Sequence, residues 1–217
     1  MTIRAVIFDM DGVLIDAKEW HFRALNRALA LFGYGIGHAE HISTFDGLPT
    51  RVKLDRLSEM RGLPRSLHEF VNEMKQAYTA ELVWLKCRPT FAHQYALSRL
   101  KAEGYRLAVA SNSIRMSVDL MMARAGLAEF LEFTLSNEDV SRPKPDPEIY
   151  RTAIGRLNLE PEQCLIVEDN PNGIAAARGS GSHVMVVRDP GDVTFESLQQ
   201  ALAQIGRPDT ANHRRAA

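Results

Sequence analysis

Short, almost continuously apolar segments recur along the chain, and each is followed by a segment with helical periodicity. The apolar segments cover residues 3–8, 107–110, 133–135, 165–167 and 184–187. Strands that are apolar on both faces are typical of a parallel sheet covered by helices on either side, because neither face meets water. The alternation therefore predicts an α/β protein with a doubly wound (Rossmann-like) parallel sheet.

The segments between these strands carry the stop signals of helices. Gly104, Gly126 and Gly181 fall where three of the helices should end, and glycine is common just beyond a helix C-terminus. Each strand is thus predicted to connect to the next through a helix that packs on the sheet. The expected helices lie near residues 90–104, 114–126, 146–158, 172–180 and 194–204.

One long segment, residues 17–87, breaks this alternation because it contains only helical patterns. A stretch of this length without a strand, between the first and second strands, predicts an inserted all-helical domain. The α/β core would then be discontinuous, formed by residues 1–16 and 88–205, with two linkers near 15–17 and 86–89. The polar C-terminal segment, residues 206–217, is expected to be a disordered tail.

Composition excludes several classes of protein. The 26 Lys and Arg residues nearly balance 27 Asp and Glu residues, so the formal charge of −1 argues against a basic nucleic-acid binder. No apolar run reaches the roughly 18 residues that a membrane helix needs, and the N-terminus lacks a secretory signal pattern. Cys87 and Cys164 have no metal-binding spacing, so we expect two free thiols in a cytoplasmic protein that contacts neither nucleic acid nor membrane.

Polar and charged side chains follow four of the predicted strands. Parallel strands present their carboxyl ends at one edge of the sheet, where ligands of open α/β proteins bind. We therefore expect acids, a hydroxyl and a lysine to converge there. The four segments are Asp9-Met10-Asp11-Gly12, Ser111-Asn112-Ser113, Arg142 to Pro147 around Lys144, and Glu168-Asp169-Asn170.

This combination of groups indicates phosphoryl transfer. Asp9 and Asp11 repel each other unless a cation or proton intervenes, and Glu168 and Asp169 add further oxygen ligands suited to Mg²⁺. Lys144 could neutralise a phosphoryl group while a carboxylate attacks phosphorus. Acids at a single strand end are commonly helix caps or solvated turns. Reactive groups at four strand ends together favour an active site.

These segments resemble the four ordered motifs of the haloacid dehalogenase-like superfamily. The resemblance rests on Asp9-Met10-Asp11-Gly12-Val13, Ser111, Lys144 and Glu168-Asp169, and it covers essentially the whole chain. It is closest to the branch with a helical cap after the first strand, which includes β-phosphoglucomutase and sugar-phosphate phosphatases. An acid two residues after the first aspartate distinguishes the chain from the dehalogenases and ion-pumping ATPases of the superfamily.

The resemblance implies a role for each motif residue. Asp9 is the expected nucleophile, and Asp11 the expected general acid and base. Ser111 and Lys144 are expected to hold phosphoryl oxygens, with Lys144 also paired to the nucleophile. The implied Mg²⁺ ligands are Asp9, the backbone carbonyl of Asp11, Asp169, and Glu168 either directly or through water.

Substrate residues are implied less directly. His21 opens the first helix of the expected cap, in a stretch similar to the start of the mutase cap, although a half-buried helical histidine is the alternative. Gly47 and Arg51 lie on the expected cap loop, with Arg51 a candidate for a distal phosphate. Lys75 is a similar candidate, with solvated surface charge as the alternative. Asn112 is a further expected substrate contact.

Two departures from the mutase pattern bear on the function. The arginine of the cap loop is displaced by one residue, and Ala17 stands where a hydroxyl residue is frequent. Four histidines outside the motifs, His38, His41, His68 and His93, lack metal-ligand spacing and are expected on the solvated surface.

The sequence therefore predicts a Mg²⁺-dependent phosphatase of a small phosphorylated metabolite, expected to be a sugar or polyol phosphate, with an aspartyl-phosphate intermediate. A β-phosphoglucomutase-type mutase is the alternative, and a non-catalytic binding protein of the same fold is a third. The physiological substrate and oligomeric state stay open.

Overall fold

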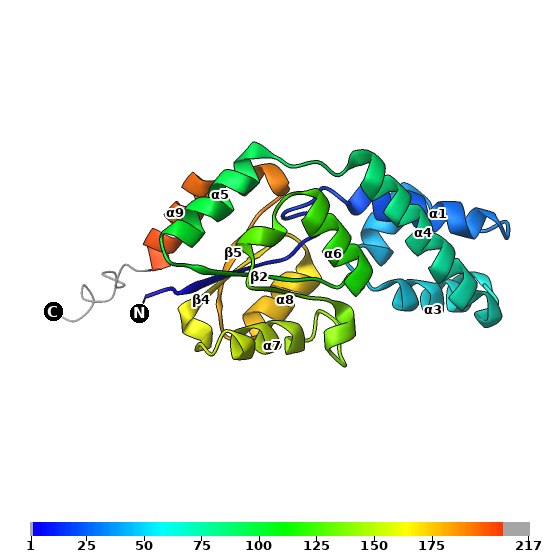
Figure 1. The fold of residues 1–217 in the computed structure, drawn as a ribbon. Helices are drawn as coiled ribbons and strands as arrows, with labels where there is room; N and C mark the ends of the chain where they lie inside the picture. The colour runs from blue at the N-terminus through cyan, green and yellow to red at the C-terminus, as the bar shows by residue number, and fades with distance from the viewer. Residues whose placement is uncertain (1, 206–217) are drawn as a thin grey trace.

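The computed structural model describes residues 2–205. Its fold is built on a five-stranded parallel sheet (Figure 1). The strand order β3-β2-β1-β4-β5 places the first strand in the middle. This is the doubly wound α/β architecture expected from the sequence, and no strand end differs from its predicted position by more than two residues. The strands are β1 (Ala5–Phe8), β2 (Arg106–Ala110), β3 (Phe133–Leu135), β4 (Cys164–Glu168) and β5 (His183–Val186).

The register of the central strands aligns their carboxyl ends. In β1, Phe8 pairs with Val109 of β2 on one side and with Val167 of β4 on the other. Residues that follow these strands consequently emerge at the same edge of the sheet. This alignment brings Asp9, Ser111 and Glu168 together although they are far apart in sequence.

Helices cover both faces of the sheet (Figure 1). Val6 and Phe8 face one layer and belong to an apolar cluster with α5, α6 and α9, whereas Ala5 and Ile7 face α7 and α8. Because alternate residues face the two layers, every position of β1 is buried, which explains its continuous apolar sequence. The layers comprise α5 (Phe91–Ala102), α6 (Arg115–Arg124), α7 (Glu148–Arg156), α8 (Pro171–Gly179) and α9 (Phe195–Ile205).

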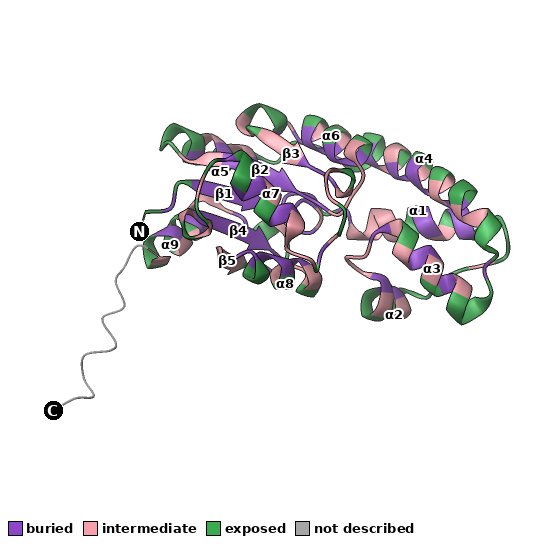
Figure 2. Ribbon diagram, turned by 90° about the horizontal axis from the view of Figure 1, so that it is seen from below, coloured by how far each residue is buried: buried purple, intermediate pink, exposed green. Residues whose placement is uncertain are grey.

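A helical region lies between β1 and β2, beyond the carboxyl end of the sheet (Figure 2). It has an apolar cluster of its own, centred on residues such as Leu25, Phe45 and Leu57. Three long helices account for the helical patterns expected in residues 17–87, and a short helical segment over residues 38–45 is additional. Such short segments escape sequence analysis because they offer no repeated periodicity. The elements are α1 (Lys18–Ala30), α2 (His38–Glu40), the π-helical turn η1 (His41–Phe45), α3 (Thr50–Arg61), η2 (Arg65–Leu67) and α4 (His68–Lys86).

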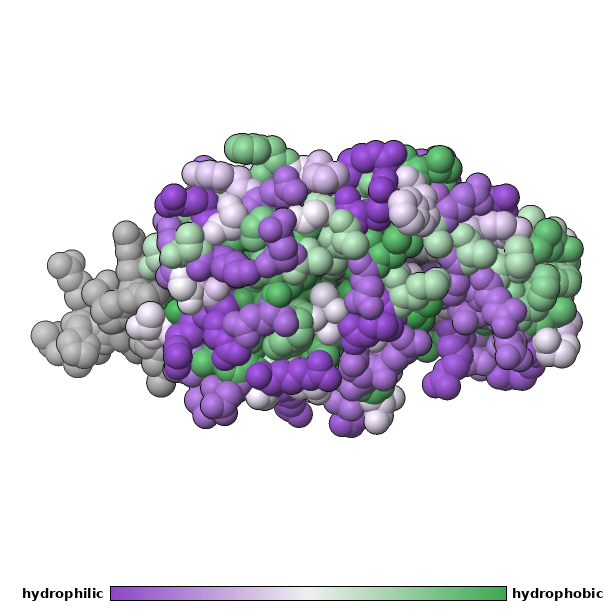
Figure 3. Space-filling view, viewed as in Figure 1, coloured by the Kyte–Doolittle hydropathy of each residue, from purple (hydrophilic) through white to green (hydrophobic). Residues whose placement is uncertain are grey.

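The remaining elements are four 3₁₀ turns in the connections around the sheet. Figure 3 shows hydrophilic and apolar side chains mixed over the exposed face of the molecule. Cys87 and Cys164 are free and buried. No helix within residues 2–205 is long and apolar enough to cross a membrane. The expected tail, residues 206–217, lies outside the described residues. The turns are η3 (Ala128–Phe130), η4 (Asn137–Asp139), η5 (Pro161–Gln163) and η6 (Pro190–Asp192).

Candidate active site

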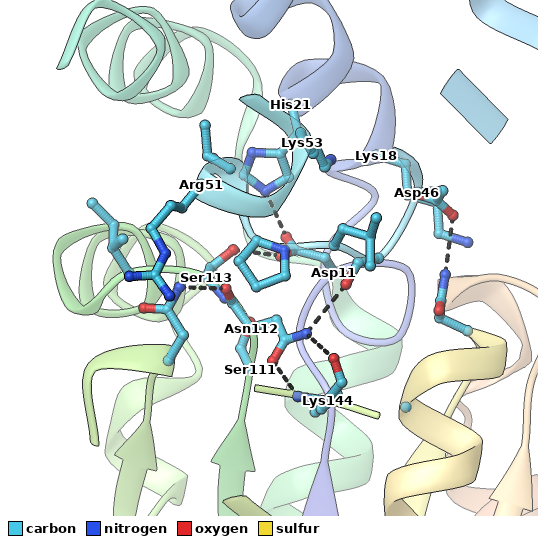
Figure 4. Close-up of a pocket in the computed structure, with 18 of the residues that line it drawn as sticks. Asp11, Lys18, His21, Asp46, Arg51, Lys53, Ser111, Asn112, Ser113 and Lys144 are labelled. Carbon is cyan, nitrogen blue, oxygen red and sulfur yellow. Dashed lines mark hydrogen bonds and ion pairs between the residues drawn. The ribbon is translucent and has the colours of Figure 1, made fainter. Parts of the chain in front are cut away.

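A cavity of about 180 Å³ lies between the carboxyl edge of the sheet and the helical region (Figure 4). Strand-end residues form one side of it, and residues of α1, α3, α4 and the 46–49 loop form the other. Asp169 does not line the cavity, but its carboxylate lies close to those of Asp9 and Glu168. The expected site residues that line the cavity are Asp9, Asp11, His21, Gly47, Arg51, Lys75, Ser111, Asn112, Lys144 and Glu168.

Lys144 is the centre of a buried network at the sheet edge. Its Nζ donates to Asp9 Oδ1 at 2.6 Å and to Glu168 Oε1 at 2.7 Å, and it also lies 2.9 Å from the carbonyl oxygen of Ala110. Burial lowers the pKa of Lys144, but attraction to the two carboxylates outweighs it and the pKa is raised. Lys144 is therefore a fixed positive charge beside Asp9.

Tyr150 completes this network and was not identified from the sequence. Its hydroxyl donates to Glu168 Oε1 at 2.6 Å and lies 2.8 Å from Lys144 Nζ. Tyr150 stands in the buried stripe of α7 beside Ile149 and Ala153, so the pattern indicates only a core residue. The only sequence signal for this contact is that Tyr150 follows Lys144 by six residues. At that separation a side chain from the first turn of α7 can reach the lysine.

Burial dominates the electrostatics of Asp9. Desolvation raises the pKa of this carboxyl well above its ordinary value, and repulsion from Glu168 and Asp11 adds to the effect, whereas Lys144 opposes it. An additional cation at this point would stabilise the ionised form of Asp9.

The neighbouring carboxylates are suited to such a cation. One oxygen each of Asp9, Glu168 and Asp169 lies within 4.8 Å of the others. Asp169 Oδ1 is buried and has no hydrogen-bond partner among the described residues, while Oδ2 pairs with Lys18. A buried carboxylate oxygen without a donor is costly unless a cation or proton meets it. These oxygens therefore fit a divalent metal with a preference for oxygen ligands.

Two glycines lie against these carboxylates, and the absence of a side chain at each glycine provides the space that the carboxylates occupy. Gly12 has a φ of +92°, and a Cβ at this position would collide with Asp169 Oδ2. A Cβ at Gly173 would collide with Glu168 Oε1. Any side chain at either position would displace a carboxylate from the cluster.

Asp11 is held on both oxygens. His21 Nε2 lies 3.1 Å from Oδ1, and the Ser113 hydroxyl donates to Oδ2 at 2.7 Å. Burial acts to raise the pKa of Asp11, but His21, Ser113 and the charge of Lys75 together lower it. The pKa of His21 is itself lowered, chiefly by burial. The structure thus brings His21 into direct contact with one of the motif acids.

Ser111 and Asn112 follow β2 and differ in their remaining hydrogen-bonding capacity. The Ser111 hydroxyl oxygen accepts from the backbone of Ser113 at 3.1 Å, which leaves its proton available to a ligand. The Asn112 side chain accepts from Lys144 N at 3.0 Å and donates to the carbonyl oxygen of Gly47 at 3.2 Å. Asn112 therefore joins the Lys144 segment to the loop of the helical region.

The helical region contributes two buried lysines to the cavity. Lys53 of α3 and Lys75 of α4 are each only 8 % exposed, whereas Arg51 lines the same cavity and is exposed. Sequence analysis did not identify Lys53. The signal was its spacing from Leu57: residues four apart share one helix face, and Leu57 belongs to the apolar cluster of the helical region.

The expectation that the other histidines lie on the surface is wrong for two of them. His41 lines the cavity and is 4 % exposed, and burial, with a contribution from Lys53, lowers its pKa to about 4. His93 is 5 % exposed, and its Nε2 lies 2.9 Å from the carbonyl oxygen of Pro190. Their burial results from helix packing, which a lone histidine in a sequence does not reveal.

Comparisons with known proteins agree with this geometry. The haloacid dehalogenase-like hydrolase family matches residues 6–187. A phosphorylated carbohydrates phosphatase of Thermotoga maritima is 33% identical over 182 residues, which are 82% of this chain and 82% of the relative. The crystal structure of CbbY from Rhodobacter sphaeroides in complex with phosphate has a TM-score of 0.78 and 25% identity, covering 85% of this chain and 86% of CbbY.

A third similarity concerns the fold alone. The structure of β-phosphoglucomutase from Clostridium difficile has a TM-score of 0.81 at 21% identity, over 94% of this chain and 98% of the mutase chain. The family match covers most of the chain, and the strand-end motifs converge on one cavity as the sequence predicted. The chain is an enzyme of the haloacid dehalogenase-like hydrolase family.

Proposed function

We propose that this enzyme is a Mg²⁺-dependent phosphatase of a small sugar or polyol phosphate, with Asp9 as the nucleophile. The observation that carries the proposal is the meeting of Asp9, Asp11, Ser111 and Lys144 on one side of a single cavity, with Asp9 and Lys144 2.6 Å apart. The volume of about 180 Å³ suits a small metabolite.

The first half of the reaction transfers the phosphoryl group to Asp9. A carboxylate oxygen of Asp9 attacks phosphorus, and the bond from phosphorus to the ester oxygen breaks. Lys144 and the Ser111 hydroxyl stabilise the negative charge on the phosphoryl oxygens. Asp11 donates a proton to the leaving oxygen, which departs as an alcohol.

The second half returns the enzyme to its starting state. Asp11, now ionised, accepts a proton from a water molecule as that water attacks phosphorus, and the aspartyl phosphate separates into phosphate and free Asp9. In the ligand-free site, His21 and Ser113 favour the ionised form of Asp11. The negative charge of a bound phosphate ester opposes this and raises the pKa of Asp11, as the acid step requires.

The metal ion is proposed on the fit of the acidic cluster. Asp9, Asp169 and the backbone carbonyl of Asp11 would hold Mg²⁺, with Glu168 contributing directly or through water. When bound, Mg²⁺ would neutralise charge on the carboxylates and the phosphoryl group. Glu168 also accepts hydrogen bonds from Lys144 and Tyr150, so it positions Lys144 as well.

We propose that residues 17–87 act as a cap over a core formed by residues 1–16 and 88–205. Two side chains of the core hold the 46–49 loop at the cavity. Asn112 donates to the Gly47 carbonyl, and Asn170 Nδ2 donates to Asp46 Oδ2 at 3.1 Å. Closure of such a cap would exclude bulk water during transfer to Asp9. Opening would break these two hydrogen bonds and admit the substrate.

The relatives support the substrate class. The Thermotoga maritima relative is named as a phosphatase of phosphorylated carbohydrates, and a mutant of CbbY was solved in complex with xylulose-(1,5)bisphosphate. A phosphorylated sugar therefore agrees with what these two relatives are named as acting on or binding.

Phosphate release tests the proposal. The wild-type enzyme should release phosphate from p-nitrophenyl phosphate and from several sugar phosphates with added Mg²⁺, and EDTA should abolish the release until Mg²⁺ is restored. The Asp9→Asn variant, folded by circular dichroism, should be inactive. Activity that persists in EDTA would remove the metal from the mechanism. No hydrolysis of any ester at any pH or metal would favour a non-catalytic binding protein.

A mutase is the second candidate, and the contact between His21 and Asp11 favours it because a histidine of the helical region could couple substrate binding to proton transfer. The exposure of Arg51 and the absence of a hydroxyl at Ala17 argue against it. The test is incubation with β-glucose 1-phosphate, with and without catalytic glucose 1,6-bisphosphate. Formation of glucose 6-phosphate that depends on the bisphosphate, without phosphate release, would establish the mutase.

A further inference from the structure

The carboxylates around the cavity already have partners. At the sheet edge, Asp9 and Glu168 bind Lys144, and the oxygens of Asp11 meet His21 and Ser113. Asp46, on the loop of the helical region, accepts from Asn170. The acidic side chains that line the cavity are therefore satisfied within the described residues.

Lys53 and Lys75 differ from this pattern. Both line the cavity and are buried, yet neither ammonium group makes a hydrogen bond or an ion pair within 4 Å in residues 2–205. Burial of an ammonium group without a counter-charge is costly, and such groups are normally paired. The two lysines therefore face a cavity in which no carboxylate of the described residues lies within ion-pair distance of either ammonium group.

The two lysines also act on each other unfavourably. The pKa of each is lowered to about 8, chiefly by burial, and the positive charge of Lys53 contributes to the lowered pKa of Lys75. Asp11 attracts both lysines and Asp46 attracts Lys53, but only from beyond ion-pair distance. Placing two such charges together weakens the protein unless they serve a ligand.

Lys53 and Lys75 both lie on the helical side of the cavity. Lys53 extends from α3, two residues after Arg51, and Figure 4 shows it above Asp11 beside His21, opposite Ser111 and Lys144 of the sheet edge. A phosphoryl group beside Asp9 and Lys144 would thus leave the rest of its substrate facing Lys53 and Lys75. Arg51, which the sequence suggested for a distal group, is exposed and can remain solvated.

We propose that Lys53 and Lys75 together bind a second anionic group of the substrate, so that the preferred substrate is a small phosphate ester bearing a carboxylate or a second phosphate. This inference rests on the proposed function, which assigns the transferred phosphoryl group to Asp9. An anion between the two lysines would neutralise both and remove their mutual repulsion. A substrate with a neutral remainder would leave two buried charges unmet.

Matched pairs of phosphate esters test the proposal. 3-Phosphoglycerate and glycerol 3-phosphate differ in one carboxylate, and fructose 1,6-bisphosphate and fructose 6-phosphate differ in one phosphate. We expect kcat/KM to favour the anionic member of at least one pair by about tenfold or more, as one charge-assisted contact provides. The pair that shows the preference identifies the distal group as carboxylate or phosphate.

Two variants assign any preference to the lysines. Lys53→Met and Lys75→Met should each reduce the preference toward unity, mainly through KM, because the remainder of the substrate is bound alike before and after phosphoryl transfer. Lys86→Met, which removes an exposed lysine of the same helix α4, is the control and should keep the wild-type ratio. A ratio near one in the wild type, or a preference that both lysine variants retain, would overturn the proposal.

A binding measurement separates this inference from the proposed function. Calorimetry on the Asp9→Asn variant reports affinity without turnover, and the anionic member of a pair should bind about tenfold more tightly. Adding Lys53→Met or Lys75→Met to that variant should abolish the difference. If the wild type hydrolyses nothing while this difference is observed, the phosphatase assignment fails and the anion site stands. If hydrolysis occurs and the difference in affinity is absent, the anion site fails and the phosphatase assignment stands.

Discussion

Two ends of one cavity hold buried lysines in opposite electrostatic situations. At the sheet edge, Lys144 has oxygens of Asp9, Glu168 and Tyr150 around it, and its pKa is raised. On the helical side, Lys53 and Lys75 have no such partners among the described residues, and the pKa of each is lowered to about 8. The first lysine is part of the folded network. The other two are stabilised only when something else supplies the negative charge.

The comparison teaches that burial alone does not indicate what a charged residue is for. A paired charge holds its neighbours in place, so its removal exposes an unmet partner. A buried charge without a partner opposes folding, so its removal should increase the free energy of unfolding. Stability and activity should therefore change together at Lys144 and in opposite directions at Lys53 and Lys75.

The largest expected effect lies at the sheet edge. Asp9→Asn should reduce kcat for p-nitrophenyl phosphate by about 10⁴-fold or more, because an amide oxygen does not replace the carboxylate nucleophile. The melting temperature should stay within a few degrees of the wild type, since Asn retains the shape of Asp and one acceptor for Lys144. Steady-state kinetics and calorimetry check this, and an active Asp9→Asn protein would contradict the assignment of the nucleophile.

Removal of the paired lysine should be next in size. Lys144→Met should lower the free energy of unfolding by about 3–5 kcal/mol, because Asp9 and Glu168 are left buried without their counter-charge. Phosphatase activity should be lost as well. Urea denaturation measures the stability, and Lys86→Met should match the wild type. A Lys144→Met protein as stable as the wild type would contradict the distinction between the paired lysine at the sheet edge and the unpaired lysines of the helical side.

The unpaired lysines should respond in the opposite sense. Lys75→Met should raise the free energy of unfolding at neutral pH by about 1–3 kcal/mol, since a buried ammonium group is replaced by an apolar side chain of similar length. Lys53→Met should have a similar effect. Each single variant already removes the repulsion between the two lysines, so the stabilisation of the double variant should be smaller than the sum of the two single effects. Urea denaturation without phosphate or substrate is the measurement. Destabilisation by both single variants would indicate structural roles.

The smallest effect is a pH dependence of that gain. A lysine with a pKa of about 8 in the folded protein and 10.5 in the unfolded chain binds fewer protons when folded between these values. Wild-type stability should therefore rise relative to Lys75→Met as the pH increases from about 8 to about 10.5. The advantage of the variant should shrink across this range and be constant below it. Denaturation at a series of pH values tests the trend.

Much of the sheet-edge side of the cavity could be predicted from the sequence. The strand pattern placed Asp9, Ser111 and Glu168 at one sheet edge, and the structure brings them there with Lys144. Tyr150 and His41 could not be predicted in the same way. Their contacts depend on how α7 and the short 38–45 segment pack, and an apolar stripe indicates burial without naming the neighbour.

The helical side illustrates the same limit more sharply. Lys53 and Arg51 are two residues apart at the start of one helix, and both are basic. An α-helix turns about 100° per residue, so they point about 200° apart. The orientation of α3, set by the packing of Leu54 and Leu57 in the helical cluster, makes Lys53 the buried one.

The sequence by itself determined the sheet, the inserted helical region and the convergence of the motif residues. It could do so because hydrogen bonding between parallel strands aligns their ends, and the short loops after the strands leave little freedom to the residues they carry. Only the tertiary structure decided which cations of the helical region face the cavity. Helices have no common edge, and their rotation and tilt depend on side-chain packing across the whole cluster. The residues proposed to carry the chemistry could therefore be predicted from the sequence, as could Lys75 as a candidate, whereas the burial of Lys53 and Lys75 at the cavity depends on the packing of α3 and α4.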